Sequence, residues 1–397
     1  MNATRGLRLL VLTELFLPTK GGTAVWFDEV YRRLGGRGIH ILTAQVPGAA
    51  AYDARHPNCI HRLRLAPVPW LRPESLPRYL RPFLHGLGVM LRHRVEAVHA
   101  GRVLPEGLVG LWLARLLERP LLVYAHGEEI TGWRAPRRRR AMRRVYRAAD
   151  AVIANSAFTR GLLLELGVSP GRVHLLHPGV ALERFTPEGP VSGMPGCERL
   201  HEGWPLVVSV GRLNPRKGFD RGIEAVARLR HAGLDVDYVI IGIGEDEARL
   251  RALVAAHGVS DRVHLLGHVP MEDLPAWLRR ADVFLMPNRD IGGDTEGFGM
   301  VFIEAAACGT PAIAGRAGGT GDAVLDGETG LRVDGEDPDA VARALAALLR
   351  DPARRAALAA RALERARREF SWDSVAARTR RIHASLVGGR RSRPASR

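Results

Sequence analysis

Short apolar runs that alternate with stretches of helical length constrain the fold of this chain more than any other feature. The first half contains the runs "LRLLVLT", "IHILTA", "EAVHA", "PLLVYAH" and "DAVIANS", and the second half contains "PLVVSVG", "DYVIIG", "VHLLG" and "VFLMP". Buried runs of Val, Ile and Leu separated by helices are typical of parallel sheets that are covered on both faces. Residues 181–204, between the two series, are rich in Pro and Gly and lack an apolar period, which predicts a linker. The sequence therefore predicts an α/β chain with two doubly wound halves of similar size.

Candidate ligand-binding cations follow the first strand of the second half. Ligands of doubly wound sheets bind beyond the carboxyl ends of the strands, and two such halves facing each other would form a cleft. The segment "SVGRLNPRKGFD" leaves its strand at Gly211 and places Arg212 and Lys217 in a loop before a helix. Two fixed cations at a loop–helix junction suit a diphosphate. Lys217 is one of only two lysines in an arginine-rich chain, which favours a need for its compact ammonium, although Lys20 shows that a lysine can persist by chance.

A second candidate site lies in "DTEGFGMVFIEAAACGTP", where two glutamates are eight positions apart. A helix that starts near Gly299 would place Glu304 about one turn inside it and Glu296 in the loop before it. The free N–H groups at such a helix start suit an anion such as phosphate. Two carboxylates beside a phosphate-sized site predict a ligand with hydroxyls on both sides of a phosphate, as in a sugar nucleotide. The alternative is that Glu296 compensates the helix dipole and Glu304 is solvated at the edge of a cleft.

The first half offers weaker signals. "PTKGGTAVW" places two glycines, including Gly22, where the first strand meets its helix, and "YAHGEE" ends another strand with His126. Glycine allows a ligand to approach the backbone closely. A plain turn explains the two glycines equally well, and a lone histidine is more often structural than functional.

The charge of the chain predicts a polyanionic partner. The net charge is +16 at pH 7, and this excess of base points to nucleic acid or to an anionic membrane surface. Eight arginines and no acid lie between Trp133 and Asp150, where a helix would bury one apolar stripe and expose an arginine face. These two sets are Met142, Val145, Tyr146 and Ala149 for the stripe, and Arg137, Arg140, Arg144 and Arg147 for the face.

Aromatic residues among arginines in residues 67–94 add to this prediction. Trp70, Tyr79 and Phe83 have the composition of a membrane interface, and ordinary core aromatics are the equal alternative. No apolar run is long enough to span a bilayer. The three cysteines are odd in number and have no metal-binding spacing, which predicts a reducing cytoplasm.

The motifs together resemble those of the retaining glycosyltransferases of family 4, which have the GT-B fold. "PTKGG", "AHGEE", "AVIANS", "LHPGVALERF", "SVGRLNPRKGFD", "EGFGMVFIEAAACGTPAIAGRAGG" and a closing "FSW" occur in the family's order over most of the chain. Glu296 and Glu304 match the family's E-x7-E signature. The segment that begins at Glu296 is most similar to the mannosyltransferases that modify phosphatidylinositol.

The resemblance implies a division of the chain. Two Rossmann-like domains would face a central cleft, an acceptor-side domain over 1–185 and a sugar-nucleotide domain over 205–370, joined by a linker over 186–204. A closing helix over 371–388 would cross back to the first domain, and a basic tail over 389–397 would be disordered.

The resemblance also implies roles for the candidate residues. His126, Glu296, Arg212 and Lys217 would be the catalytic residues, with the two cations holding the diphosphate and Glu296 and His126 reaching the transferred sugar. Glu304 would bind the ribose hydroxyls. Further donor contacts would come from Gly22, from Val269 near the base, and from the backbone of Phe298, Gly299, Met300 and Val301.

The implied activity is transfer of a hexose, mannose before glucose, from a donor of the GDP-mannose or UDP-glucose type to a lipid, glycan or small-molecule acceptor. Fixed cations and a helix N-terminus can stabilise the leaving diphosphate, so neither a metal nor another cofactor is expected. Front-face attack is the favoured route to retention, and a covalent intermediate on Glu296 is the alternative. The expected location is cytoplasmic, with peripheral attachment to the inner face of the cell membrane and no nucleic acid partner.

Two other functions remain open from the sequence. A sugar phosphorylase or an epimerase could use the same fold. A basic nucleic-acid-binding protein with a vestigial site is the alternative from another class, although the chain has no recognised nucleic-acid reader motif.

Overall fold

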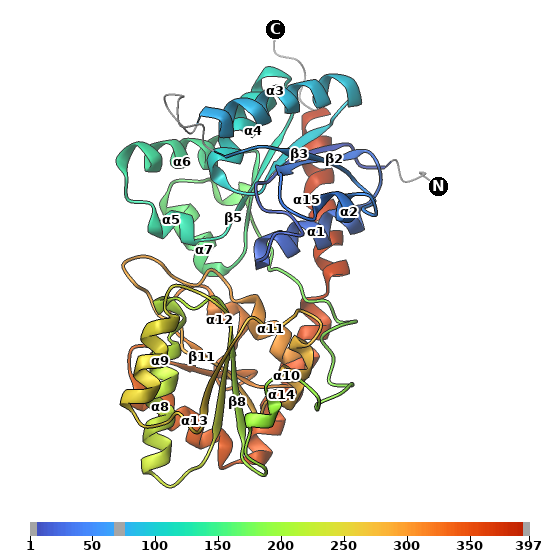
Figure 1. Cartoon of the computed structure of the whole chain (residues 1–397). Helices are drawn as coiled ribbons and strands as arrows, with labels where there is room; N and C mark the ends of the chain where they lie inside the picture. The colour runs from blue at the N-terminus through green and yellow to red at the C-terminus, as the bar shows by residue number, and fades with distance from the viewer. Residues whose placement is uncertain (1–5, 67–75, 392–397) are drawn as a thin grey trace. The chain divides into compact units, whose positions relative to one another are not determined.

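The computed structural model describes residues 6–66 and 76–391, and its chain divides into two compact units (Figure 1). Unit 1 comprises the chain up to Pro178 together with the part from Trp372 onward, and unit 2 comprises Gly179–Ser371. Trp70 lies outside the described residues, as do residues 392–397 of the expected basic tail.

Unit 1 is built on a parallel sheet of seven strands in the order β3-β2-β1-β4-β5-β6-β7. These strands are β1 Leu9–Leu12, β2 Ile39–Ala44, β3 Cys59–Leu63, β4 Ala97–Ala100, β5 Leu121–Ala125, β6 Ala151–Ala154 and β7 Val173–Leu175. β1, β4, β5 and β6 are buried along their whole length, as expected for strands covered by helices on both faces. The strand order reverses between β1 and β4, so the carboxyl ends of these two strands mark the switch point of the sheet.

The helices of unit 1 lie between its strands and include the last helix of the chain. They are α1 Gly22–Leu34, α2 Ala49–Asp53, α3 Leu76–His93, α4 Leu108–Leu116, α5 Glu128–Gly132, α6 Pro136–Ala148, α7 Ala157–Glu165 and α15 Trp372–Arg391, with short turns η1 Val103–Gly107 and η2 Pro170–Arg172. The helix α15 packs against α1, where Arg380 donates a hydrogen bond to the carbonyl of Leu34 at 3.2 Å. In addition, Arg378 donates to the carbonyl of Leu175 at 2.8 Å, so both α1 and β7 hold α15 on unit 1.

Unit 2 repeats the architecture with a parallel sheet of six strands in the order β10-β9-β8-β11-β12-β13. Its strands are β8 Leu206–Val210, β9 Asp237–Ile241, β10 Val263–Gly267, β11 Val283–Met286, β12 Ala312–Gly315 and β13 Gly330–Val333. Its helices and turns are η3 Cys197–Arg199, η4 Pro215–Lys217, α8 Phe219–His231, α9 Glu247–Ala256, α10 Leu274–Arg280, α11 Met300–Ala307, α12 Thr320–Ala323, α13 Pro338–Leu349 and α14 Pro352–Glu369. The order reverses between β8 and β11, which places the switch point of unit 2 at their carboxyl ends.

The Pro- and Gly-rich stretch over 181–204 folds as part of unit 2. Its backbone is irregular apart from η3, yet Phe185 and Met194 are buried. The missing apolar period therefore reflects an irregular backbone and not a lack of burial.

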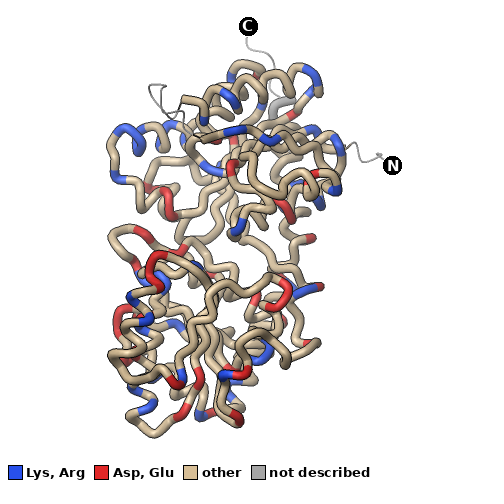
Figure 2. Tube along the Cα trace, in the orientation of Figure 1, with Lys and Arg blue, Asp and Glu red and all other residues tan. Residues whose placement is uncertain are grey.

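Charge is divided unevenly between the two units (Figure 2). Unit 1 contains 34 Lys and Arg against 13 Asp and Glu, a net charge of +21, whereas unit 2 contains 24 against 29, a net charge of −5. The basic excess of the chain therefore belongs to unit 1 alone.

Candidate functional site

The carboxyl ends of β8 and β11 bring two loops of unit 2 together. The loop after β8 contains Gly211 to Gly218, and the loop after β11 leads to the start of α11. The amide of Arg289 in the second loop donates to the carbonyl of Arg216 in the first at 2.8 Å. Since this is the switch point of the sheet, the two loops occupy the place where doubly wound sheets bind ligands.

Lys217 and Glu296 form an ion pair at this place. Their side chains are each 12% exposed, and the Lys217 Nζ lies 2.5 Å from the Glu296 Oε2. The Lys217 side chain also lies against Gly211 at the end of β8. Burial acts to raise the pKa of Glu296, but the charges of Lys217 and Arg216 outweigh burial, so that the pKa is below its usual value. Glu296 is therefore ionised at neutral pH and holds the ammonium at the switch point.

Arg216 is a third member of this cluster, which the sequence prediction missed. Its guanidinium lies 3.5 Å from the Glu296 Oε2 and 3.4 Å from the Asp294 carboxylate, and it donates to the carbonyl of Thr295 at 2.7 Å. The sequence analysis named Lys217 but not its neighbour Arg216. Both residues belong to the turn η4, and sequence spacing alone does not show that this turn brings both side chains to Glu296. The cluster thus fixes two cations, not one, beside the loop that precedes α11.

The helix α11 begins where the sequence predicts, with Gly299 as its N-cap. Gly299 has a φ of 85°, and a Cβ added there would lie 2.6 Å from the Phe302 ring, so glycine is required on both counts. The amide of Phe298 donates to the Glu296 carboxylate. Among residues 6–66 and 76–391, the amides of Gly299, Met300 and Val301 have no protein acceptor, which leaves three donors for an anion or a hydroxyl.

Glu304 lies in the second turn of α11 and differs from Glu296 in its surroundings. Its carboxylate forms no hydrogen bond or ion pair with the part of the chain that the structure describes. Burial raises the pKa of Glu304 to about 7, which the nearby charge of Arg184 offsets only in part. Glu304 therefore offers an open acceptor for ligand hydroxyls.

Arg212 and Val269 lie at the same edge of the sheet but outside this cluster. Arg212 follows β8 and pairs with Glu245 at 3.1 Å, and both side chains are more than half exposed. Such an exposed pair contributes little to stability and can exchange for an anionic ligand. Val269 follows β10 and is half-buried.

His126 and Gly22 belong to unit 1. His126 follows β5 and is 7% exposed, and its Nε2–H donates to the carbonyl of Gly101 at 2.9 Å. Its own amide is held by the Glu129 carboxylate at 3.0 Å. Gly22 is the exposed first residue of α1. The Nε2 of His126 therefore carries a proton, because a carbonyl oxygen can only accept, and Nδ1 is the other polar atom of the ring.

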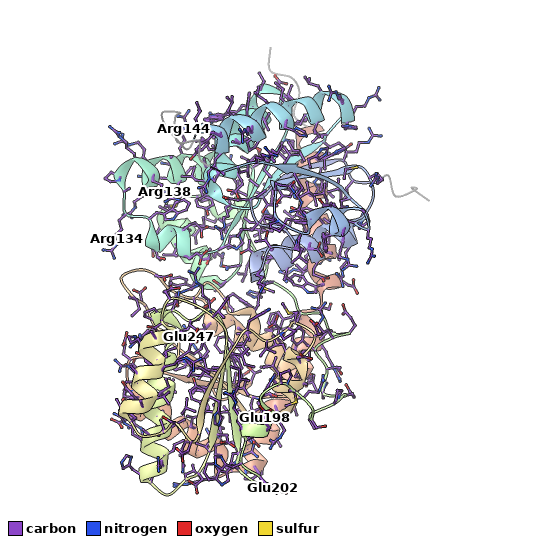
Figure 3. All side chains as sticks on the ribbon, in the orientation of Figure 1. Arg134, Arg138, Arg144, Glu198, Glu202 and Glu247 are labelled. Carbon is purple, nitrogen blue, oxygen red and sulfur yellow. The ribbon has the colours of Figure 1, made fainter. Side chains whose placement is uncertain are left out.

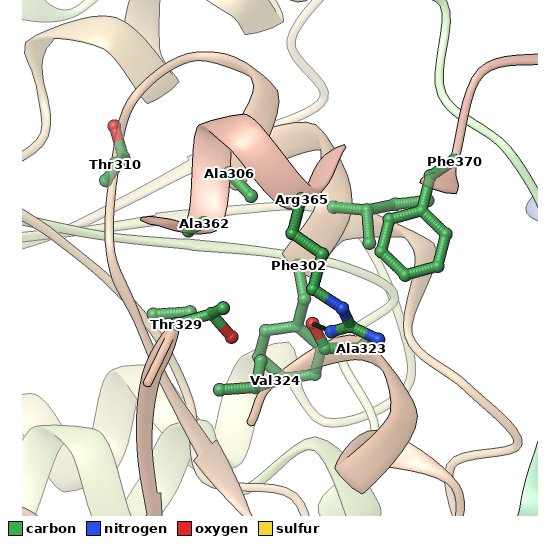
Figure 4. A pocket seen from close by; sticks show the side chains of 11 residues that line it. Phe302, Ala306, Thr310, Ala323, Val324, Thr329, Ala362, Arg365 and Phe370 are labelled. Carbon is green, nitrogen blue, oxygen red and sulfur yellow. Dashed lines mark hydrogen bonds between the residues drawn. The ribbon is translucent and has the colours of Figure 1, made fainter. Parts of the chain in front are cut away.

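A pocket behind α11 is not part of this site (Figure 4). Its walls are mainly apolar and include Phe302, Val324 and Phe370. Its polar groups have protein partners, since Arg365 donates to the carbonyls of Asp322 and Ala323. We therefore regard it as a gap in the packing.

No group of three or more His, Cys, Asp and Glu side chains in the described part of the chain has an arrangement that could hold a metal ion. Metal independence nevertheless stays a prediction until it is tested.

The chain has two doubly wound units, and unit 2 has paired cations and free helix amides at its switch point. These features are typical of a class of α/β proteins that bind phosphorylated ligands. Within that class, residues 20–184 match the family model for glycosyltransferase family 4, and residues 198–365 match the model for glycosyl transferases group 1. The chain belongs to this glycosyltransferase family, which confirms the resemblance drawn from the motifs.

Several curated relatives are similar over nearly the whole chain. A GDP-mannose-dependent α-(1-6)-phosphatidylinositol monomannoside mannosyltransferase of Mycolicibacterium smegmatis is 35% identical over 96% of this chain and 99% of its own length. A D-inositol 3-phosphate glycosyltransferase of Catenulispora acidiphila is 32% identical over 94% of this chain and 93% of its own.

Solved structures confirm the predicted GT-B fold. The Anabaena protein HepE, solved in complex with UDP, matches with a TM-score of 0.80 at 19% identity, covering 96% of this chain and all of that chain. A sucrose-phosphate synthase from Thermosynechococcus elongatus matches with a TM-score of 0.77 at 22% identity, with the same coverage. At these identities the likeness concerns the fold alone.

Proposed function

We propose that this glycosyltransferase transfers mannose from GDP-mannose, with retention and without a metal, to the polyol headgroup of a phosphatidylinositol-type lipid. The observation that carries the proposal is the Lys217–Glu296 pair beside the free amides of α11, with the open carboxylate of Glu304 in the same helix. The names of the relatives support mannose as the sugar and a phosphoinositol lipid as the acceptor.

The donor would bind to the cations of the loop after β8 and to the amides and carboxylates at the start of α11. The diphosphate would take the charges of Lys217, Arg216 and Arg212 together with the free amides of α11. The Glu304 carboxylate would accept both ribose hydroxyls, and Glu296 would accept a hydroxyl of the sugar.

The reaction would then proceed by front-face attack. The bond between the sugar C1 and the diphosphate oxygen breaks as the acceptor hydroxyl oxygen bonds to C1 on the same face. The proton of that hydroxyl passes to the departing diphosphate oxygen, and GDP leaves. Lys217 and Arg216 offset the charge that grows on the diphosphate in the oxocarbenium-like transition state, which is why the step would need no metal.

The acceptor would reach the enzyme through a surface of unit 1 formed by α3, α4 and α6. The helix α4 packs against both α3 and α6. On α3 and α4, five large apolar side chains are 43 to 66% exposed, namely Leu80, Leu84, Leu91, Trp112 and Leu116. No helix in the described residues is long and apolar enough to cross a membrane.

The helix α6 adds positive charge to the surface that contains the exposed apolar residues of α3 and α4. Its predicted apolar stripe is buried, and its arginines are exposed, of which Arg138 and Arg144 can be followed in Figure 3. Exposed leucines beside an arginine face suit the boundary between headgroups and acyl chains of an anionic membrane. We therefore propose peripheral attachment of unit 1 to such a membrane.

The division of roles between the two glutamates tests the donor site. Glu304→Ala should weaken the binding of GDP by about tenfold or more, since it removes hydrogen bonds to a charged group. Glu296→Gln should leave GDP affinity near that of the wild type and mainly lower turnover. Titration calorimetry with GDP and initial rates with GDP-mannose measure both effects. Equal losses of GDP affinity in the two variants would refute the assignment.

A further inference from the structure

A buried ion pair joins the two segments of unit 2 that carry the donor site. Asp220 lies in the first turn of α8, and Arg289 lies in the loop after β11. The Arg289 Nη2 donates to the Asp220 Oδ2 at 2.9 Å, and the two side chains are only 8% and 5% exposed. The pair therefore connects the segment that follows β8 with the segment that follows β11.

This pair rests on one hydrogen bond. The Asp220 Oδ1 and the Arg289 Nη1 are buried and have no hydrogen-bond partner among the described residues. More exposed side chains lie farther away, with Arg249 at 3.3 Å from Asp220 and Glu336 at 3.6 Å from Arg289. Burial acts to raise the pKa of Asp220, but the hydrogen bond and the charge of Arg289 outweigh burial, so that the pKa is below its usual value. Removal of either member would leave a buried charge without its nearest partner.

The backbones of the two segments meet at the same place. The amide of Arg289 donates to the carbonyl of Arg216 at 2.8 Å. Gly218 has a φ of 74°, and a Cβ added there would lie 2.0 Å from the carbonyl oxygen of Pro287, so the end of η4 is in direct contact with the end of β11. Asp220 and Arg289 each lie two residues beyond that contact. The ion pair thus fastens the junction on which η4 rests.

The turn η4 has little structure of its own to hold it. Its local backbone hydrogen bonds are those from Lys217 to the carbonyl of Asn214, at 3.1 Å, and from Gly218 to the carbonyl of Pro215, at 3.2 Å. Lys217 belongs to the segment after β8, and its partner Glu296 belongs to the segment after β11. A movement between the two segments would therefore separate them, and a displacement of about 1 Å in an active site can lower a rate by about 10²-fold.

We infer that Asp220 and Arg289 are positioning residues of the donor site, whose buried pair holds η4 against the loop after β11 and so keeps Lys217 at Glu296. The inference rests on the proposed function, to which it adds the residues that place the leaving-group cations. Both side chains are buried and directed at each other, so they act through Lys217 and not on the donor itself.

Lys217 can report its own position, because the chain contains only two lysines. Acetic anhydride acylates amines that are accessible and deprotonated. The exposed Lys20 should therefore react fast, whereas Lys217, 12% exposed and paired with Glu296, should react slowly. Digestion of the treated full chain and mass spectrometry give the ratio of the two rates. This ratio measures how often Lys217 leaves its pair, and it requires no donor.

Two variants each remove one charge of the pair. Asp220→Asn and Arg289→Met should raise the rate at Lys217 relative to Lys20 by about tenfold or more. Mannose transfer to phosphatidylinositol vesicles should fall by about 10- to 100-fold, and by more than GDP affinity falls, because the cations act mainly on the diphosphate as it leaves. Arg289→Lys keeps a cation for the single hydrogen bond and should restore both values to within about threefold of the wild type.

Arg262→Met is the matched control in the same unit. The Arg262 side chain is also 8% exposed and pairs with Asp235 at 2.7 Å. It precedes β10, however, and so lies at the opposite edge of the sheet from the donor site. This variant should lower the melting temperature but leave the rate at Lys217 and the affinity for GDP as in the wild type.

The double variant Asp220→Leu with Arg289→Met separates positioning from general stability, and it covers the case in which a single variant does not fold. Apolar replacement of both members should recover the melting temperature of the wild type. Lys217 should stay reactive, because the charge-assisted hydrogen bond between the segments is gone. Wild-type reactivity of Lys217 in the folded single or double variants would overturn the inference, as would an equal rise of reactivity in Arg262→Met.

The acylation experiment also keeps the two proposals apart. Failure of the wild type to bind GDP would refute the proposed function, whereas the rates at Lys217 would still decide whether the pair holds η4.

Discussion

At the scale of single residues, the two glutamates of the E-x7-E pair are opposites in their electrostatics. Lys217 and Arg216 lower the pKa of Glu296, whereas burial raises the pKa of Glu304 to about 7. The positions of the two glutamates on either side of the start of α11 could be predicted from the sequence, but the contrast between their pKa values could not. It depends on Arg216, which the sequence analysis missed, and on the absence of any such partner for Glu304 within the described residues.

This contrast predicts opposite effects of pH on stability. Between the pKa of an unfolded glutamate and about pH 7, the folded protein keeps a proton on Glu304 that the unfolded chain has lost. The contribution of Glu304 to stability is therefore present below the unfolded pKa and is lost as pH rises to about 7. Glu304→Gln should therefore raise the melting temperature at pH 8, by about 2 °C or more, and change it little at pH 5. For Glu296 the pKa is lowered, so its contribution is present above the unfolded pKa and is lost in acid.

Glu296→Gln is accordingly the matched control and should lower the melting temperature at pH 8. Differential scanning fluorimetry of both variants and the wild type at the two values of pH measures these shifts. A shift of the same sign in both variants at pH 8 would contradict the electrostatics described above.

At the scale of elements, burial explains what the sequence could predict. Strands such as β5 and β8 are short and almost fully apolar, so their position is evident from composition. The strand β3 reads "CIHRL" and is half-buried along its length, so it lacked the apolar signal and was not predicted.

The start of α11 gives the prediction at this scale. Gly299→Ala would force a side chain into a left-handed backbone and against the Phe302 ring, so it should destabilise the protein by about 1–3 kcal/mol. GDP affinity should fall as well, because the three free amides would move. Gly171→Ala, where a Cβ has open space and φ is not positive, is the control and should change neither quantity. Urea denaturation and calorimetry measure both, and wild-type stability in Gly299→Ala would contradict the geometry.

At the scale of the whole molecule, the charge is concentrated in unit 1, at +21 against −5 in unit 2. The excess of basic residues was evident from the sequence. Its division between the two units could be counted only from the bounds of the units in the structure. Trp70 lies outside the described residues, so the interfacial part of the prediction depends on the exposed leucines of α3 and α4.

Membrane attachment should follow the charge of unit 1. The wild type should sediment with phosphatidylglycerol vesicles at low salt and be released at high salt, because screening shortens the range of its charges. Replacement of four α6 arginines should reduce binding by at least about tenfold, since each basic residue contributes about 1 kcal/mol. The replaced residues are Arg137, Arg140, Arg144 and Arg147, each changed to Gln. GDP affinity should not change in this variant.

A variant with the same charge change on unit 2 is the control for this experiment. It carries Gln at Arg343, Arg350, Arg354 and Arg367, all of which are exposed. It should bind vesicles as the wild type does. Equal loss in both variants would mean that net charge alone drives binding, and no binding by the wild type at low salt would exclude the membrane surface.

The most direct test of the central claim is transfer of labelled mannose from GDP-mannose to phosphatidylinositol-containing vesicles in the presence of EDTA. We predict a mannosylated lipid and one GDP released for each mannose transferred, with the anomeric configuration of the donor retained in the product. Lys217→Ala should lower turnover by about 10²- to 10³-fold, because a cation that stabilises the leaving diphosphate is removed. Turnover that requires added Mg²⁺ or Mn²⁺, or GDP release that does not depend on the lipid, would contradict the account.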